Sequence, residues 1–371
     1  MHARLFMHSI PIIPLPTMST TPIKPNKPEF AQPGPAPEGV NAPTLFDVAR
    51  LANVSPSTVS RIINGSAKVS SERKRAVEEA IRLLKFRPNF SAKSLRSGST
   101  MTIGVLTQDF DSLYFARALK GIEKGLEGSG YAPLVIPGHW NPAEEAERMR
   151  LLMARKVDAI AVLGGSLRDS ELVEFARMQP IVVTGRKIEG HQLRGFHFDH
   201  VRGALMATQH LIERGHTRIA YIAGPRAHPD ALDRTEGFFQ AHRQAQLPFN
   251  PALMVEGDYQ EAGGDAAMVS LLDSGIPFTA VFCANDQTLW GARMALYRLG
   301  RAVPGEFSLV GFDDLPQSQY MTPPVTTVHQ PIFELGLAAA QSLLQALGAE
   351  LEAEPALVEP YLVLRETTRA L

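Results

Sequence analysis

Short apolar runs alternate with longer helical segments along most of this chain, and this rhythm limits its possible folds more than any other feature. The apolar runs form a first set at residues 103–106, 134–136, 159–163 and 181–183, and a second set at 219–222, 280–283 and 309–312. Strand–helix alternation of this length predicts parallel sheets with helices on both faces. The two sets indicate two lobes, and ligands of such folds bind at the carboxyl ends of the strands. We therefore expect a two-lobed α/β core over residues 101–371.

The segment before this core differs from it in charge. Residues 44–100 hold eleven Lys and Arg against four Asp and Glu, a net charge of +7, whereas residues 101–371 have a net charge of −9. At 371 residues the chain is also too long for one compact core. A small basic segment joined to a large acidic one suggests that only the small one meets a polyanion. An accidental imbalance of surface charge is the alternative.

Three short helices are predicted in the basic segment. The first has small apolar residues on one face: Leu45, Val48, Ala49 and Ala52. Asn53-Val54 forms a turn, and Ser55-Pro56 opens the second helix, because serine caps a helix start and proline tolerates the first helical position. A third helix over residues 71–84 has apolar residues at core spacing. This is a helix-turn-helix, whose second helix fits the DNA major groove.

The same segment carries an extended residue pattern. It runs Asp47-Val-Ala-x-x-Ala52-x-Val54-Ser55-x-x-Thr58-Val-Ser-Arg61, then Asn64-Gly65, Val69-Ser70, Arg87-Pro-Asn89 and Ser94-Leu-Arg-Ser-Gly98. The core adds His210-Leu-Ile-x-x-Gly-His216, Ala223-Gly-Pro225 and Thr322-Pro-Pro-x-Thr-Thr-Val-x-Gln330. The pattern closely resembles the LacI/GalR family of repressors over residues 44–371. A helix-turn-helix match alone is a weak signal, but here the third helix and the following hinge are in register as well.

The resemblance implies which residues contact DNA. The family recognises bases with the start of the second helix and the turn after it, here Pro56, Ser57, Arg61 and Lys68. Pro56 has no useful donor, and Arg61 is the strongest candidate because a guanidinium can bond a guanine edge bidentately. Phosphate contacts, which set the register on DNA, are expected from Thr44, Thr58, Ser60 and Asn64. For Ser60 and Asn64, helix solvation and capping are equally good explanations.

The segment after the headpiece resembles the family's hinge helix, which forms only on DNA and lies in the minor groove. Its candidate DNA contacts are Asn89, Ala92, Lys93, Leu95 and Arg96. Leu95 matches the position that wedges between the central base pairs and bends the duplex. The alternative is a linker residue that packs on the core. A helix this short has only marginal stability on its own, so its folding can depend on the state of the core domains.

The resemblance also implies a type 1 periplasmic-binding-protein fold for the core, with an effector in the cleft between its lobes. Positions that bond ligand hydroxyls or ring atoms in the family match Arg234, Asn285 and Asp313. The implied neighbours are the stacking residue Tyr259, Gln330 near the crossover, Phe115 from the other lobe, and the variable rim residues Arg186, His228 and Asp230. We expect these nine residues to surround the effector.

These residue types suit a neutral polyhydroxylated molecule such as a sugar. Two alternatives stay open: Arg234 and Asp313 as a structural ion pair, and Asn285 as a helix cap. Gly185 stands where many relatives carry an aspartate, and Arg186 follows it. We therefore expect a sugar contact shared by those relatives to be missing and Arg186 to replace it, which makes a carboxylated or phosphorylated ligand a stronger alternative. We expect a sugar or a sugar acid.

Other functions find no support in the sequence. The chain has no phosphate-loop sequence and no His/Cys cluster with metal spacing, so we expect no catalytic residue, metal or cofactor. The single cysteine, Cys283, lies in an apolar run and is interpreted as a buried thiol in a reducing compartment. The apolar stretch at residues 5–15 could be taken for an export signal, but it contains Pro11 and Pro14. No apolar span long enough for a membrane helix follows it. We expect a cytoplasmic protein that does not enter a membrane, with Met1 or Met18 as its first residue.

The sequence thus predicts an all-α helix-turn-helix headpiece followed by a two-lobed α/β core with parallel sheets. The expected division is a disordered Pro-rich tail (1–43), the headpiece (44–88), a hinge helix and linker (89–100) and the core (101–371). Lobe 1 takes about 101–199 and 330–356, and lobe 2 about 200–329 and 357–371. We expect a homodimer on a pseudo-palindromic operator, with a tetramer left open, acting as a repressor under an inducer or a corepressor. The rivals are a solute-binding receptor, which would lack a headpiece, and an enzyme of sugar metabolism.

Overall fold

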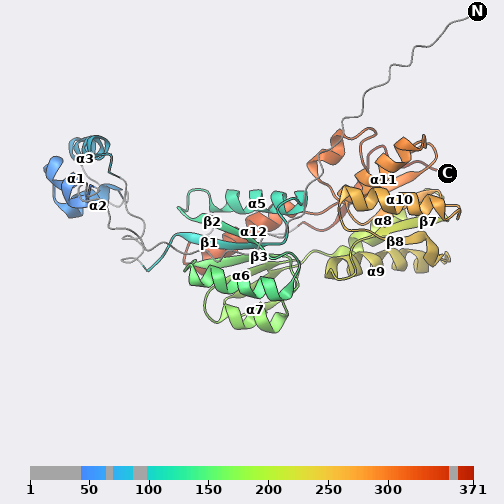
Figure 1. Cartoon of the computed structure of the whole chain (residues 1–371), viewed down its shortest axis with the longest axis horizontal. Coiled ribbons are helices and arrows are strands. Elements are labelled where there is room, and N and C mark those ends of the chain that lie inside the picture. The colour runs from blue at the N-terminus through green and yellow to red at the C-terminus, as the bar shows by residue number, and fades with distance from the viewer. Residues whose placement is uncertain (1–42, 64–69, 87–97, 351–357) are drawn as a thin grey trace, which may run out of the picture. The chain divides into compact units, whose positions relative to one another are not determined.

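The computed structural model describes residues 43–63, 70–86, 98–350 and 358–371. The chain forms two compact units, Met1–Pro88 and Asn89–Leu371 (Figure 1). Several residues with predicted roles lie outside the described residues: the tail up to residue 42, Asn64, Lys68, Asn89, Ala92, Lys93, Leu95 and Arg96.

The first unit contains the predicted helix-turn-helix. Its helices are α1 (Leu45–Leu51), α2 (Pro56–Ile63) and α3 (Ser71–Leu84). Thr44 and Asp47 form a capping box at the start of α1, and the Ser55 hydroxyl accepts a hydrogen bond from the Thr58 amide at 3.2 Å at the start of α2. Side chains from all three helices meet in one small core: Val48, Ala49, Val59, Val77 and Ala80. The expected helical headpiece is therefore confirmed.

The second unit contains two six-stranded sheets, with strand orders β2-β1-β3-β4-β6-β5 and β12-β11-β10-β9-β7-β8. The first sheet is built from β1 (Thr102–Thr107), β2 (Ala132–Pro137), β3 (Ala159–Leu163), β4 (Ile181–Thr184), β5 (Glu189–Gly190) and β6 (Leu193–Phe196), with helices α5 (Leu113–Leu126), α6 (Pro142–Ala154), α7 (Asp169–Ala176) and α12 (Ile332–Ala346). The second is built from β7 (Ile219–Ala223), β8 (Met254–Glu256), β9 (Ala280–Cys283), β10 (Ser308–Asp313), β11 (Thr327–His329) and β12 (Tyr361–Val363), with helices α8 (His200–Glu213), α9 (Pro229–Gln244), α10 (Glu261–Asp273) and α11 (Asp286–Arg298) and the 3-10 turns η1 (Pro251–Leu253) and η2 (Pro316–Tyr320).

The central strands are buried on both faces, as a sheet covered by helices on both sides requires. Every residue of β3, β4, β7 and β9 is buried, which explains why these strands are continuous apolar runs in the sequence. Cys283 is one of these buried residues and is a free thiol. The predicted two-lobed α/β core is confirmed.

The expectation of parallel sheets needs one correction, at an edge of each sheet. β5 pairs antiparallel with β6, and β12 pairs antiparallel with β11. A tight hairpin joins β5 to β6, and adjacent hairpin strands must run in opposite directions. β12 belongs to the segment after α12, near the end of the chain, and runs along β11 from the opposite end. Both antiparallel strands are only two or three residues long, so no apolar run marked them in the sequence.

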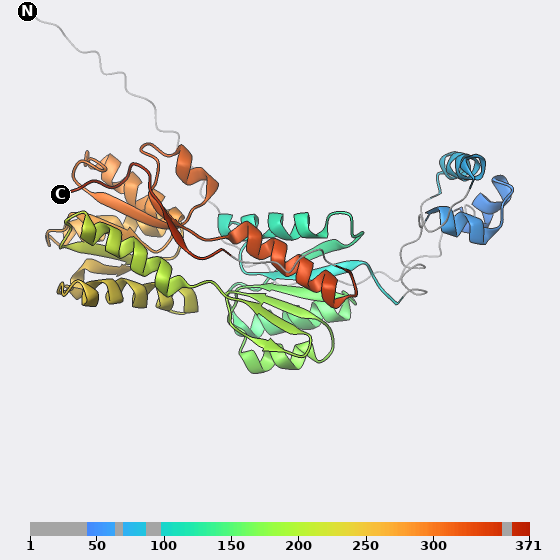
Figure 2. The same cartoon turned by 180° about the vertical axis from the view of Figure 1, so that it is seen from behind.

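Helix α12 shows that the chain passes between the two sheets more than once. It follows β11 of the second sheet, yet it lies beside α5 on the first sheet, as both views show (Figures 1 and 2). Glycines allow the close approach of these helices, because a Cβ atom at Gly121 would lie 2.0 Å from the Phe333 carbonyl oxygen. After α12 the chain returns to the second sheet as β12. Within the described ranges, no helix has both the length and the apolar character needed to cross a bilayer.

Candidate functional site

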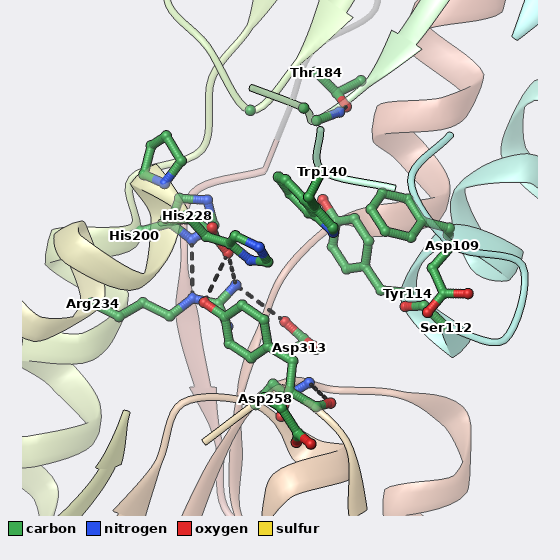
Figure 3. Close-up of a pocket in the computed structure, with 18 of the residues that line it drawn as sticks. Asp109, Ser112, Tyr114, Trp140, Thr184, His200, His228, Arg234, Asp258 and Asp313 are labelled. Atoms are coloured by element: carbon green, nitrogen blue, oxygen red, sulfur yellow. Dashed lines mark hydrogen bonds and ion pairs between the residues drawn. The ribbon is translucent and has the colours of Figure 1, made fainter. Parts of the chain in front are cut away.

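A pocket of about 190 Å3 lies in the second unit, where segments that follow the strands of both sheets converge (Figure 3). From the first sheet it is lined by Asp109, Ser112, Tyr114 and Phe115 after β1, Trp140 after β2, Gly164 and Gly165 after β3, and Thr184, Gly185 and Arg186 at the end of β4. From the second it is lined by His228, Pro229, Asp230 and Arg234 after β7, Asp258, Tyr259 and Gln260 after β8, Asn285 after β9, Asp313 at the end of β10, and His200 of α8. This is the position at which α/β sheets bind ligands.

Most of the residues expected around the effector meet at this pocket. Eight of the nine line it: Phe115, Arg186, His228, Asp230, Arg234, Tyr259, Asn285 and Asp313. Gln330 lies directly behind the lining, where its Nε2 donates to the Tyr114 hydroxyl at 3.2 Å and its Oε1 accepts from Arg234 at 3.3 Å. Their predicted roles in binding an effector stay predictions.

Arg234 is the centre of the polar side of the pocket. Its side chain is only 3% exposed, and its Nη2 lies 3.5 Å from a carboxylate oxygen of both Asp230 and Asp313. Its Nη1 donates to the Ala284 carbonyl oxygen, and its guanidinium lies over the Phe312 ring at 4.0 Å. The ion pair considered in the sequence interpretation is therefore present, and it also faces the pocket.

The two carboxyl groups beside Arg234 differ in their proton affinity. Burial opposes the ionisation of Asp230, but the charge of Arg234 and the hydrogen bond from the Tyr259 hydroxyl at 3.0 Å outweigh it and lower its pKa. Burial raises the pKa of Asp313 well above its usual value, and Asp286 and Asp230 add to this effect against the attraction of Arg234. The pocket thus offers one ionised acceptor and one carboxyl group that holds a proton more readily, which suits hydroxyl groups because they both donate and accept.

Asn285 caps a helix and faces the pocket at once. Its Oδ1 accepts from the Thr288 amide at 2.9 Å at the start of α11, as expected for a capping residue. Its Nδ2 donates to the Tyr259 carbonyl oxygen at 3.0 Å, which ties the loop after β8 to α11. The helix-capping role, which was the alternative to ligand binding for Asn285, is therefore present in the structure.

Arg186 lies at the pocket, but both of its terminal guanidinium nitrogens already have acceptors. One guanidinium nitrogen donates to the Leu167 carbonyl oxygen and lies 3.1 Å from Asp169, and the other donates to the Gly165 carbonyl oxygen. Arg186 thus holds the loop after β3 in place. These contacts compete with a ligand for the guanidinium group, so the structure supports an acidic ligand less strongly than the residue types alone do.

His200 is buried beside Arg234 and has an unusually low proton affinity. Its Nδ1 lies 3.4 Å from Arg234 Nε. Burial, reinforced by the charge of Arg234, lowers the pKa of His200 to about 3. A folded-state pKa below the unfolded value of about 6.5 means that His200 favours folding above pH 6.5. This contribution is lost progressively as the pH falls toward 3.

We expect the His200 ring to stay neutral in the folded protein from pH 7 down to pH 4.5. Its ring resonances, assigned by comparison with a His200→Gln variant, should not move over this interval in a nuclear magnetic resonance titration. The urea-unfolded chain is the control, in which all histidines should titrate near pH 6.5. Titration of His200 near pH 6 in the folded chain would contradict the burial argument.

Some pocket residues were missed by the sequence interpretation, and Trp140 is the clearest of them. It is one of two tryptophans in the chain and follows the end of β2. Its position after a strand was a usable signal, because ligands of parallel sheets bind at the carboxyl ends of the strands, and β2 is one of these strands. His200 carried no such signal, because the strand it follows, β6, is not a continuous apolar run and could not be recognised in the sequence.

In the headpiece, the predicted base-contacting face of α2 is accessible. Ser57 and Arg61 are exposed, whereas Pro56, Thr58 and Ser60 are half-buried. The Ser57 and Thr58 hydroxyls each lie 2.8 Å from the Ser55 hydroxyl, and the Thr44 hydroxyl donates to Asp47 at 2.7 Å. The Thr44 side chain, which is expected to contact a DNA phosphate, therefore also caps α1. The DNA contacts stay predictions.

Two family models match the chain. Residues 44–89 match the one described as bacterial regulatory proteins, lacI family, and residues 208–368 match the one described as a periplasmic binding protein-like domain. The HTH-type transcriptional regulator GalR of Salmonella typhimurium (strain LT2) is 37% identical over 306 residues, which cover 82% of this chain and 90% of GalR. The HTH-type transcriptional repressor PurR of Actinobacillus pleuropneumoniae is 33% identical over 333 residues, which cover 88% and 99%.

Solved structures show the same similarity. The lac repressor dimer bound to operator and the anti-inducer ONPF superposes with a TM-score of 0.76 at 27% identity, covering 89% of this chain and 100% of that one. The complex of the transcriptional regulator CelR with cellobiose superposes with a TM-score of 0.63 at 32% identity, covering 88% and 99%. The headpiece, the two-lobed core and these relatives agree: the chain belongs to the LacI family of bacterial DNA-binding transcriptional regulators.

Proposed function

We propose that this regulator is a repressor whose affinity for its operator is set by a neutral sugar in the pocket. The observation that carries the ligand assignment is the cluster around Arg234. A single buried guanidinium lies 3.5 Å from two carboxyl groups of different proton affinity, beside aromatic rings. Polar groups placed against aromatic rings are what sugar hydroxyls and the apolar face of a sugar ring require.

The charge of the lining favours a neutral ligand over an acidic one. Four carboxyl groups line the pocket, at Asp109, Asp230, Asp258 and Asp313, against the two guanidinium groups of Arg186 and Arg234. Arg186 already donates to main-chain carbonyls, and Arg234 is shared between two aspartates. An anionic ligand would add a negative charge to a lining with an excess of carboxylates, which costs Coulomb energy in a poorly solvated site.

For the DNA-bound state, we propose a homodimer with one headpiece on each half of a pseudo-palindromic site. Two-fold symmetry of the protein then matches two-fold symmetry of the DNA, and the predicted hinge with Leu95 bends the centre. The expected division into headpiece, hinge and two-lobed core is part of this proposal. The lac repressor structure is a dimer on its operator, and the CelR structure holds cellobiose, which supports both halves of the proposal.

The test of this function is a ligand panel on the purified protein. D-ribose, D-glucose, D-galactose and cellobiose are compared with gluconate and glucose 6-phosphate by thermal unfolding. A neutral sugar that binds should raise the melting temperature, since ligand at 100 times its Kd stabilises the folded state by about 2.7 kcal/mol. The same sugar should change operator affinity by an amount that corresponds to about 1–3 kcal/mol of coupling.

An Asp313→Asn variant is the control, because it should lose the thermal shift and keep DNA binding. Stabilisation by gluconate or glucose 6-phosphate alone would contradict the neutral-ligand assignment. Absence of salt-sensitive, sequence-selective DNA binding, with or without the sugars, would contradict the proposed repressor function.

A further inference from the structure

Two aromatic rings face the middle of the pocket from opposite sheets, and each is held rigidly. Trp140 follows β2, where its amide donates to Gln108 Oε1 at 2.9 Å, and its indole lies against Gly164, so that a Cβ there would be 3.3 Å from the ring. Tyr259 follows β8, and its ring lies against Gly224, where a Cβ atom would come within 2.3 Å of it. We call the space between Trp140 and Tyr259 the aromatic slot.

The imidazole of His228 stands in the aromatic slot. Its ring stacks on Trp140 with centroids 3.8 Å apart and an interplanar angle of 20°, and its other neighbour is Tyr259 at 5.7 Å. Figure 3 shows the Trp140 and His228 rings facing each other at the centre of the pocket. A side chain from the second sheet thus covers the ring face that the first sheet presents to a ligand.

One ring nitrogen of His228 lacks a hydrogen bond to any described residue in this position. Its Nδ1 is buried and has no hydrogen-bond partner among the described residues, although His228 is the residue that precedes the first turn of α9. Burial lowers the pKa of His228, so its ring is neutral at pH 7. The ring is then kept in the aromatic slot by stacking alone. A buried unpaired nitrogen is costly, and turning the side chain out to water would relieve that cost. The imidazole is therefore held in the slot only weakly.

The size of the pocket indicates what moves when a ligand enters. At about 190 Å3 the cavity is smaller than the roughly 300–1,000 Å3 typical of small-molecule sites. Trp140 and Tyr259 lie against glycines and are tied by hydrogen bonds to Gln108 and Asp230, whereas His228 is bound to the pocket by one ring stack. His228 is thus the group that can leave and enlarge the cavity at the point where a ring would stack.

We propose that Trp140 and Tyr259 form the two walls of a ring-binding slot for a sugar, and that His228 is an internal competitor that the sugar displaces. This inference rests on the proposed function, because it names the subsite in which the sugar ring lies. Aromatic faces bind the C–H face of a pyranose ring, and the ring hydroxyls would then reach Asp230 and Arg234. The apparent affinity is reduced by the fraction of molecules in which His228 fills the slot.

The test is a substitution series at position 228, measured by calorimetric titration with D-galactose, D-glucose, D-ribose and cellobiose. His228→Ala empties the slot and should tighten binding of the active sugar about threefold to tenfold, the range expected for loss of a weak stacking competitor. His228→Phe stacks at least as well as histidine and should weaken binding. Trp140→Ala should weaken it more than tenfold. The exposed His191 is outside the pocket lining, and His191→Ala should leave the affinity unchanged.

The order of affinities separates this inference from its alternatives. If His228 instead donated a hydrogen bond to the sugar, the alanine and phenylalanine variants would both bind more weakly, and the competitor role would be overturned while the proposed function stands. If none of the four sugars binds either the original chain or His228→Ala, the neutral-sugar function and this inference both fail.

A measurement without ligand reports on the stack itself. Trp290→Phe leaves Trp140 as the single tryptophan of the chain, since the sequence has only two. In that background His228→Ala should change the intensity and position of the Trp140 emission, because it uncovers the indole face. An unchanged spectrum would overturn the stacking arrangement on which the inference depends.

Discussion

Replacing Arg234 with alanine is expected to lower the free energy of unfolding by about 3–5 kcal/mol, since removing one member of a buried ion pair leaves an uncompensated charge. Here the loss concerns two carboxyl groups, because Asp230 and Asp313 each lie 3.5 Å from the same guanidinium nitrogen. The Ala284 carbonyl oxygen and Gln330 Oε1 would lose their donor as well. Urea unfolding at pH 7 measures the change. The thermal shift with the active sugar should vanish too.

The matched control is Arg226→Ala. Arg226 lies in the loop that precedes α9 and pairs with Glu256, and both of these side chains are exposed. Exposed pairs of this kind contribute about 0–1 kcal/mol, so its loss should be small. Adding Asp313→Asn to Arg234→Ala should restore part of the lost stability, because it removes one of the two buried carboxyl groups that lose their guanidinium partner. Equal effects of Arg234→Ala and Arg226→Ala would contradict the central role of the buried cluster.

Arg61→Ala is expected to weaken binding to the specific operator by about 1–3 kcal/mol and to relax the preference at one position of the half-site. Arg61 is exposed on α2, the helix that opens at Pro56 after the turn of the helix-turn-helix. A guanidinium on this helix can bond the two acceptors of a guanine edge, which alanine cannot. Selection from random duplexes, with the original chain and the variant at one salt concentration, measures the preference at every position.

Arg82→Ala provides the comparison for Arg61. Arg82 is an exposed arginine of the same headpiece, but it lies on α3 and pairs with Glu79. Both variants remove one positive charge, so both can lower the non-specific, salt-dependent part of the affinity. Only Arg61→Ala should alter the selected sequence. If the two variants select the same half-site as the original chain, α2 does not recognise bases through Arg61.

The fold was predictable because its main elements have strong local signals. The central strands are buried on both faces, so their sequences are continuous apolar runs that stand out from the helices between them. The first two headpiece helices begin at capping residues whose chemistry is local, Thr44 and Ser55. The short edge strands β5 and β12 have no such signal, and their antiparallel direction depends on partners that only the folded chain brings alongside.

The candidate site was predictable in part, for a related reason. Polar residues at or just past the ends of strands, such as Asp313 and Asn285, could be placed at the carboxyl edge from the sequence alone. The other contacts that these side chains make within the protein could not be predicted from the sequence. That Arg186 donates to the carbonyl oxygens of Gly165 and Leu167, and that Trp140 stacks on His228, depends on side-chain directions across two sheets.

The sequence by itself determined the order of elements, the basic headpiece and the set of polar residues that end the strands, because these follow from periodicity, capping and charge within short windows. Only the tertiary structure decided which of those residues share a guanidinium and which ring fills the aromatic slot. Trp140 and His228 are 88 positions apart in the chain, yet their rings are 3.8 Å apart in space. Contacts of that kind arise from the packing of two sheets, which no local pattern encodes.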